Sequence, residues 1–234
     1  MENKTENGMY CYKYPHPAVT TDCVMFGFDG LKMKVLLIRR GIEPYKGQWA
    51  FPGGFLHMDE SAREGALREL QEETGLKDAP LRQFHTFSAP ERDPRERVIT
   101  IGYYALVRLS EVKGADDADE ARWFAMDEIP SLAFDHDMIL RTALTELRRQ
   151  IHFEPVGFEL LPEKFTIKQL QYLYETILDV CFDRRNFYNK MRHLDLLEQL
   201  DEKAKPTPKR EAFLFRFRPE KYEELKEKGF RLEF

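Results

Sequence analysis

Residues 54–76 read GFLHMDESAREGALRELQEETGL, and this stretch decides how the first part of the chain folds. Ser61, followed three residues later by Glu64, has the spacing of a capping box, which predicts that a helix begins there. Gly75 is the residue type that commonly ends a helix, so we expect the helix to stop at that point. The glycine pair that ends with Gly54 allows a backbone turn which a side chain would obstruct.

Three glutamates of this helix, Glu69, Glu72 and Glu73, are spaced so that they lie on neighbouring positions of its surface. Carboxylates held together repel one another unless a cation binds them, and hard oxygen ligands favour Mg²⁺ or Mn²⁺. The three are therefore candidate metal ligands and, with Arg68 and Glu60, candidate catalytic residues. The alternative is a solvated helix face that is merely rich in glutamate.

The whole stretch resembles the Nudix box, the signature of enzymes that cleave nucleoside diphosphates linked to another group. Every position of that pattern is filled, by Gly54, Glu60, Arg68-Glu69-Leu70, Glu72-Glu73 and Gly75-Leu76. Since a long motif in a fitting context is specific, the resemblance implies an α/β fold, the Nudix α/β/α sandwich.

The segments around the box predict the strands that such a sandwich requires. Strands are expected at residues 19–28, 34–39, 82–88, 98–107 and 120–124. Asp29-Gly30 is a turn signal that joins the first two strands into a hairpin. A helix opening within residues 131–137 and running to about His152 carries leucines at helical spacing, which indicates a core face or a dimer contact.

A loop at residues 90–97 (PERDPRER) combines two prolines with three arginines. Guanidinium groups bind phosphate bidentately, so Arg92, Arg95 and Arg97 are candidates for phosphate contact, although a solvated loop fits the charge pattern equally well. His136 follows an apolar segment and favours a structural hydrogen bond. The expected ligand-binding residues are Trp49, Phe51, Arg92, Arg95 and His136.

Residues 154–164 contain two prolines and a glycine and predict a connection between two domains, residues 1–153 and 154–234. Thr166 and Gln169 then repeat the capping-box spacing, and Asp183 is placed to cap a second helix. Strands are expected at residues 196–200 and 212–217, with a basic tip between them. Helix, turn, helix and hairpin in this order predict a winged helix-turn-helix.

The second of these helices carries an exposed stripe of Arg185, Tyr188, Asn189 and Arg192, and arginine and asparagine read guanine and adenine at base edges. Residues 184–218 contain ten Lys and Arg against five Asp and Glu, a net charge of +5, whereas the whole chain carries −5 and its remainder −10. A basic module on an acidic body suits phosphate contact, although a winged helix used only for protein contacts is the alternative. The expected DNA-binding residues are Arg184, Arg185, Tyr188, Asn189, Lys190, Arg192, Lys203, Lys205, Lys209 and Arg210.

The two parts together resemble the Nudix-related transcriptional regulators, from about Tyr14 to Phe217. Besides the box, the resemblance rests on residues 92–95, 133–136 and 166–200. It implies a homodimer on palindromic operator DNA and a Nudix domain that senses a small effector, either ADP-ribose or a sugar such as the pentose arabinose. Many regulators of this group have lost part of the box, whereas this chain keeps it. A Mg²⁺-dependent pyrophosphohydrolase acting on ADP-ribose is therefore the alternative to the favoured regulator.

The composition is that of a globular protein, with 42% hydrophobic residues among 234. There is no apolar run long enough to cross a bilayer, and the first residues lack the apolar segment of a secretory signal. Three cysteines, far apart, do not indicate a disulfide framework. We expect a cytoplasmic protein with no membrane partner.

Overall fold

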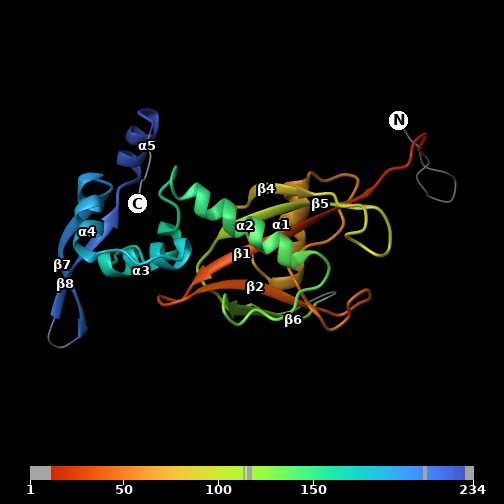
Figure 1. The fold of residues 1–234 in the computed structure, drawn as a ribbon, viewed down its shortest axis with the longest axis horizontal. Helices are drawn as coiled ribbons and strands as arrows, with labels where there is room; N and C mark the ends of the chain where they lie inside the picture. Colours follow the sequence, from red (N-terminus) through yellow and green to blue (C-terminus); the bar gives the residue numbers. More distant parts are fainter. Residues whose placement is uncertain (1–11, 113, 115–117, 208–209, 230–234) are drawn as a thin grey trace.

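The computed structural model describes residues 12–112, 114, 118–207 and 210–229. A mixed sheet with a helix on each face forms the larger part of an elongated molecule, and the winged helix elements lie at one end (Figure 1). In chain order the elements are β1 (Ala18–Phe28), β2 (Met33–Arg40), β3 (Trp49–Ala50), α1 (Ala62–Thr74), β4 (Arg82–Phe87), β5 (Val98–Leu106), β6 (Ala118–Ala125), α2 (His136–Gln150), the 3-10 helix η1 (Phe158–Leu160), α3 (Ile167–Leu178), α4 (Arg184–His193), β7 (Leu197–Thr207), β8 (Arg210–Phe217) and α5 (Pro219–Glu227).

The sheet has six strands in the order β3-β2-β1-β5-β4, and β6 also pairs with β2. The predicted hairpin joins β1 and β2, where Asp29 Oδ1 accepts hydrogen bonds from the backbone N–H groups of Leu31 and Lys32 at 2.9 and 2.8 Å. An aspartate that binds the backbone two residues on is a common turn former. The central pairing of β1 with β5 is parallel and joins segments about 80 residues apart, which local sequence signals do not reveal.

Each face of the sheet buries a separate apolar cluster, which confirms the predicted sandwich. On one face Cys23, Met25 and Leu36 lie in the same cluster as Ala66 and Leu70 of α1. The other face belongs to a larger cluster that includes Val24, Phe26 and Leu37 of the sheet and Ile139, Ala143 and Leu147 of α2. Alternation along β1 and β2 sends successive side chains to opposite faces, so both clusters come from the same strands.

The ends of α1 lie where the sequence predicts them. Ser61 Oγ accepts a hydrogen bond from Glu64 N at 3.3 Å, and Glu64 Oε2 accepts one from Ser61 N at 2.8 Å, which completes the capping box. Gly75 ends the helix with φ 76°, a conformation that glycine adopts without strain. By contrast, α2 begins at His136, because Phe134 adopts φ 52° and interrupts the helix expected from residue 131.

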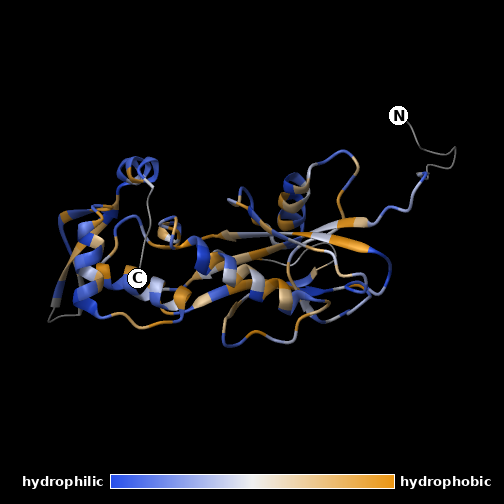
Figure 2. Ribbon diagram, turned by 45° about the horizontal axis from the view of Figure 1, so that its top comes forward, coloured by the Kyte–Doolittle hydropathy of each residue, from blue (hydrophilic) through white to orange (hydrophobic). Residues whose placement is uncertain are grey.

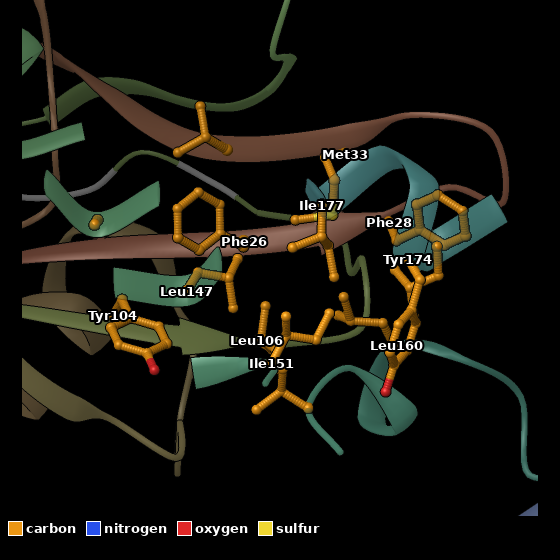
Figure 3. Packing of buried hydrophobic residues seen from close by; sticks show 14 of the residues in the cluster. Phe26, Phe28, Met33, Tyr104, Leu106, Leu147, Ile151, Leu160, Tyr174 and Ile177 are labelled. Atoms are coloured by element: carbon orange, nitrogen blue, oxygen red, sulfur yellow. The ribbon is translucent and has the colours of Figure 1, made fainter. Parts of the chain in front are cut away.

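The larger cluster runs without a break from the sheet into the winged helix elements (Figure 3). Tyr174 and Ile177 of α3 lie beside Phe28 and Met33 at the β1–β2 hairpin, and Ile151 follows the end of α2. α3 has the predicted capping box at Thr166, and Asp183 Oδ1 accepts the cap hydrogen bond of α4 from Asn186 N at 2.8 Å.

The hairpin that follows α4 differs from the prediction. β7 continues to Thr207 through residues expected to form a basic tip, with register shifts between Gln199 and Lys203 and between Ala204 and Thr207. A two-stranded hairpin consists of edge strands, which accept proline and irregular pairing, so Pro206 does not end the strand. The sequence also gave no expectation of α5, a largely hydrophilic helix beyond the hairpin (Figure 2). None of the described helices is long and apolar enough to cross a membrane.

Candidate functional site

A cavity of about 400 Å³ opens where β1, the glycine turn, α1 and the start of α2 meet. Of the residues expected to bind metal or ligand, it brings together Phe51, Glu69, Glu72, Glu73, Arg92, Arg95 and His136. The structure does not place Trp49 among the lining residues, because its ring packs edge-on against Phe124 of β6 at 4.7 Å between centroids. Arg97 also lies outside the lining and donates to Ala89 O at 3.0 Å.

Arg68 holds together the carboxylates of Glu60, Glu69 and Glu72. Its guanidinium donates to Glu60 Oε1 and Oε2 at 2.7 and 3.0 Å, to Glu69 Oε1 at 2.8 Å and to Glu72 Oε2 at 2.9 Å. It also reaches the carbonyl oxygen of Phe55 at 3.1 Å. Hydrogen bonds from Arg68 and from the backbone of His57 lower the pKa of Glu60 to about 2. Glu60 and Arg68 therefore order the acidic cluster from beside the cavity.

Glu73 is the carboxylate at the buried end of the cluster. Its Oε2 accepts a hydrogen bond from Gly53 N at 2.8 Å, and the close approach of Gly53 to the carbonyl of Thr21, at φ 156°, leaves no space for a Cβ atom. Burial, together with the nearby carboxylates of Glu69 and Asp22, raises the pKa of Glu73 to about 8.

This donor set fits a hard divalent cation. Glu69, Glu72 and Glu73 offer only carboxylate oxygen, and their mutual repulsion is what a cation would relieve. Within the described part of the chain, however, no three such side chains are already gathered as a metal-binding group, since Arg68 now holds Glu69 and Glu72. Metal binding therefore stays a prediction.

A buried polar network forms the opposite wall of the cavity. Arg92 donates to Asp135 Oδ2 through Nε at 3.0 Å and to Asp135 Oδ1 through Nη2 at 2.7 Å, and Nη2 lies 3.6 Å from Asp22 Oδ2. His136 Nδ1 accepts a hydrogen bond from Phe51 N at 2.9 Å, and its Nε2 lies 3.4 Å from Asp22 Oδ1. Burial lowers the pKa of His136, so the ring is neutral and ties α2 to the strands.

Arg95 lies nearer the cavity mouth. It donates to both carboxylate oxygens of Asp93, at 3.0 and 2.8 Å, and its guanidinium carbon lies 5.1 Å from the ring centroid of Phe55 and 5.9 Å from that of Phe134. Arg40 stands 4.9 Å over the same Phe134 ring. Cations and aromatic faces at one opening suit an anionic ligand that also carries flat groups.

No ligand-binding role was predicted for several residues of this cavity: Thr20, Asp22, Arg40, Phe55, Asp93 and Phe134. Asp22 gave one usable signal, because an acidic residue within an otherwise apolar strand has to find a partner when the strand is buried. Its Oδ2 accepts a hydrogen bond from Thr100 Oγ1 at 2.7 Å. The remaining lining residues could not be predicted in this way, because their position at the cavity depends on which segments of the chain meet there.

The second candidate site is the outer face of α4. This helix buries Phe187 and Met191, and its exposed side chains include those of Arg184, Arg185, Asn189 and Arg192. Tyr188 and Lys190 are half-buried, and the guanidinium carbon of Arg192 lies 5.8 Å from the centroid of the Tyr188 ring. The predicted stripe therefore faces solvent, and most of α4 is hydrophilic (Figure 2).

A hollow of about 560 Å³ separates α4 from β8 and contributes to the same surface. Lys168, at the start of α3, joins Arg184 and Arg185 in its lining, although the sequence pattern did not include it. Lys203 is exposed and pairs with Glu211 at 2.8 Å. The side chains of Lys205, Lys209 and Arg210 lie outside the described part of the structure.

Comparison with protein-family models gives two matches that follow the two parts of the chain. The NUDIX domain matches residues 16–146, and the NrtR DNA-binding winged helix domain matches residues 157–217. α5 lies beyond both matched segments.

Curated relatives and solved structures share one or both parts. The ADPR responsive transcriptional repressor NtrR of Acinetobacter baylyi is 32% identical over 215 residues, 90% of this chain and 86% of the relative. An ADP-ribose pyrophosphatase of Methanocaldococcus jannaschii is 42% identical over 128 residues, 55% of this chain and 73% of the relative. The crystal structure of Shewanella oneidensis NrtR complexed with a 27mer DNA has a TM-score of 0.72 at 27% identity and covers 92% of this chain and 97% of its own.

The acidic helix beside the cavity lies in the segment that matches the NUDIX domain, and the exposed basic face of α4 lies in the segment that matches the winged helix domain. The similarity to the Acinetobacter baylyi repressor extends over 90% of this chain. The chain belongs to the NrtR family of Nudix-related transcriptional regulators, with a Nudix domain followed by a DNA-binding winged helix domain.

Proposed function

We propose that this protein is a repressor that binds operator DNA as a homodimer and releases it when ADP-ribose occupies the cavity of the Nudix domain. The observation that carries the proposal is the exposure of Arg185, Asn189 and Arg192 on one face of α4 while Phe187 and Met191 anchor that helix. Side chains free to reach base edges from an anchored helix are what major-groove recognition needs. The similarity to the ADPR responsive transcriptional repressor of Acinetobacter baylyi supports it.

The cavity favours ADP-ribose over a free pentose as the effector. Arg40, Arg92 and Arg95 line it, and guanidinium groups recognise phosphate oxygens well. A free sugar such as arabinose carries no charge to match them. The carboxylates of α1 complete the site, because a divalent cation between them and a diphosphate would neutralise both.

The proposal is tested with full-length protein and a duplex that the protein itself selects from a random-sequence pool. Fluorescence anisotropy, recorded in EDTA and again in Mg²⁺ before AMP accumulates, is expected to show the duplex affinity falling as ADP-ribose is added and staying unchanged with arabinose. For each tenfold rise in salt concentration, the logarithm of the duplex affinity is expected to fall by about 0.9 per phosphate contact, with several contacts contributing. Light scattering is expected to give two chains per duplex. An affinity that ADP-ribose leaves unchanged would refute the sensing role, and a response to arabinose alone would identify the other effector.

A second function is favoured by the complete acidic cluster of α1, ordered by Arg68, and by the identity of 42% to an ADP-ribose pyrophosphatase. We propose that, with Mg²⁺ or Mn²⁺ bound by Glu69, Glu72 and Glu73, the site hydrolyses ADP-ribose to AMP and ribose 5-phosphate. The cation would activate the water and neutralise the diphosphate.

Glu72→Gln is expected to reduce this hydrolysis at least about 10–100-fold, because even residues that only support metal ligands have effects of that size. Chromatographic measurement of AMP in Mg²⁺ checks it. Glu64→Gln is the matched control, since glutamine also completes the capping box that Glu64 forms with Ser61. If wild type releases no AMP, the enzyme proposal is wrong while the sensor proposal stands.

A further inference from the structure

Asp135 occupies the N-cap position of α2, yet among the described residues its carboxylate accepts no cap hydrogen bond. Aspartate is a preferred N-cap, because a carboxylate oxygen accepts hydrogen bonds from the first amides of a helix. Here both carboxylate oxygens accept hydrogen bonds from Arg92 instead, at 3.0 and 2.7 Å. A capping carboxylate would find its partners among the first amides of α2, of which Met138 N now donates to the backbone oxygen of Asp135 at 2.8 Å.

Arg92 is the partner that a ligand can take away. Its side chain is 4% exposed and lines the cavity, so a bound ligand is positioned to contact its guanidinium. A diphosphate binds guanidinium through paired hydrogen bonds, as a carboxylate does, and would compete with Asp135 for the same donors. The backbone beside Asp135 is strained, with Phe134 at φ 52° and its ring in the cavity wall. Phe134 and His136, the neighbours of Asp135 on either side, thus line the cavity.

α2 connects this point to the DNA-binding part of the chain. It has 15 residues and is therefore about 22 Å long. Near its far end Leu147 is fully buried in the cluster that includes α3, and Arg148 Nε donates to the carbonyl oxygen of Ile177 in the last turn of α3 at 2.9 Å. α4 follows after a short turn, so a shift of α2 reaches the helix that carries the predicted base contacts.

We propose that Asp135 exchanges Arg92 for the N-terminal amides of α2 when an anionic effector binds Arg92, and that α2 passes this change to the winged helix through Arg148 and Ile177. The inference rests on the proposed sensing function and specifies the structural change by which the effector would act. A ligand shifts an equilibrium only through different contacts in the two states, and the exchange supplies that difference.

Asp135→Asn tests the exchange, because asparagine keeps the capping oxygen and loses the charge that holds Arg92. ADP-ribose affinity, measured by calorimetry in EDTA, is expected to rise about fivefold or more, while affinity for the selected duplex falls. A purely structural role of Asp135 would lower both affinities. Asp135→Ser, which also caps, repeats the test should the first variant fold poorly. An ADP-ribose affinity that is unchanged or lower in the folded variant overturns the exchange.

Arg148→Met tests the transmission, since methionine keeps an apolar stem and removes the donor to Ile177. The factor by which ADP-ribose weakens duplex binding, usually about 5–150-fold for coupled sites, is expected to approach one, with ADP-ribose affinity within about twofold of wild type. Arg149→Met is the matched control, because Arg149 is exposed and pairs with Glu146 on its own helix. If ADP-ribose weakens duplex binding by Arg148→Met as much as it does for wild type, transmission through Arg148 is refuted. If ADP-ribose does not weaken duplex binding by the wild type, the result refutes the proposed sensing function rather than the transmission through Arg148.

Discussion

Replacing Arg185 and Asn189 of α4 together by alanine is expected to weaken binding of the selected duplex by two orders of magnitude or more. Each bidentate contact to a base contributes about 1–3 kcal/mol to discrimination, and both side chains are exposed on the face of α4 that we place in the DNA groove. Fluorescence anisotropy at fixed salt measures the effect. Because neither residue belongs to the apolar cluster, the denaturation midpoint and the ADP-ribose affinity are expected to stay unchanged.

The control for this prediction is Arg141→Ala, which removes a positive charge from the exposed side of α2. It separates loss of base contacts from loss of net charge. Affinity for an unrelated duplex is expected to fall much less than affinity for the selected one, since nonspecific binding depends on phosphate contacts. Equal losses on both duplexes would mean that α4 reads no sequence, and a loss below threefold would place the DNA elsewhere.

Arg92→Met is expected to lower the free energy of unfolding by about 3–5 kcal/mol, the usual effect of removing one member of a buried ion pair. The carboxylate of Asp22, which is buried, and that of Asp135, which is partly buried, would lose the guanidinium beside them. Urea denaturation at pH 7 measures the loss, with an unchanged slope as evidence that only stability has changed.

The double variant Arg92→Met with Asp135→Asn shows whether the loss comes from the uncompensated charge. It is expected to recover part of the stability, because a neutral amide is less unfavourable than a carboxylate at a site without its cation. No recovery would assign the loss to the packing of the Arg92 stem instead. A loss below about 1 kcal/mol in the single variant would mean that the pair contributes as little as a surface ion pair does.

The acidic helix was predicted correctly because its signals are local, and the sandwich was predicted correctly from the resemblance of that stretch to the Nudix box. Ser61, Glu64 and Gly75 fix both ends of α1 through contacts within a few residues, and the period of two along β1 defines both faces of the sheet. The winged helix was predicted for the same reason, from the caps at Thr166 and Asp183.

The remainder depends on parts of the chain that are far apart. Arg92 was expected to bind ligand, but its pairing with Asp135 joins residues 43 positions apart, and no local pattern predicts it. The same holds for the parallel pairing of β1 with β5, and for Asp22, whose partners come from three other segments. Trp49 was expected beside the ligand, whereas its ring packs against Phe124.

The unbroken apolar cluster shared by α2, α3 and the β1–β2 hairpin limits how the two halves of the molecule move. Interlocked side chains such as Phe28, Tyr174 and Ile177 oppose separation, which would expose them to water, more than they oppose sliding. We therefore expect relative motion of the two halves to be a small shear displacement of packed helices rather than a hinge that swings open. In a dimer, such a displacement in both subunits would change the spacing of the two α4 helices along a duplex.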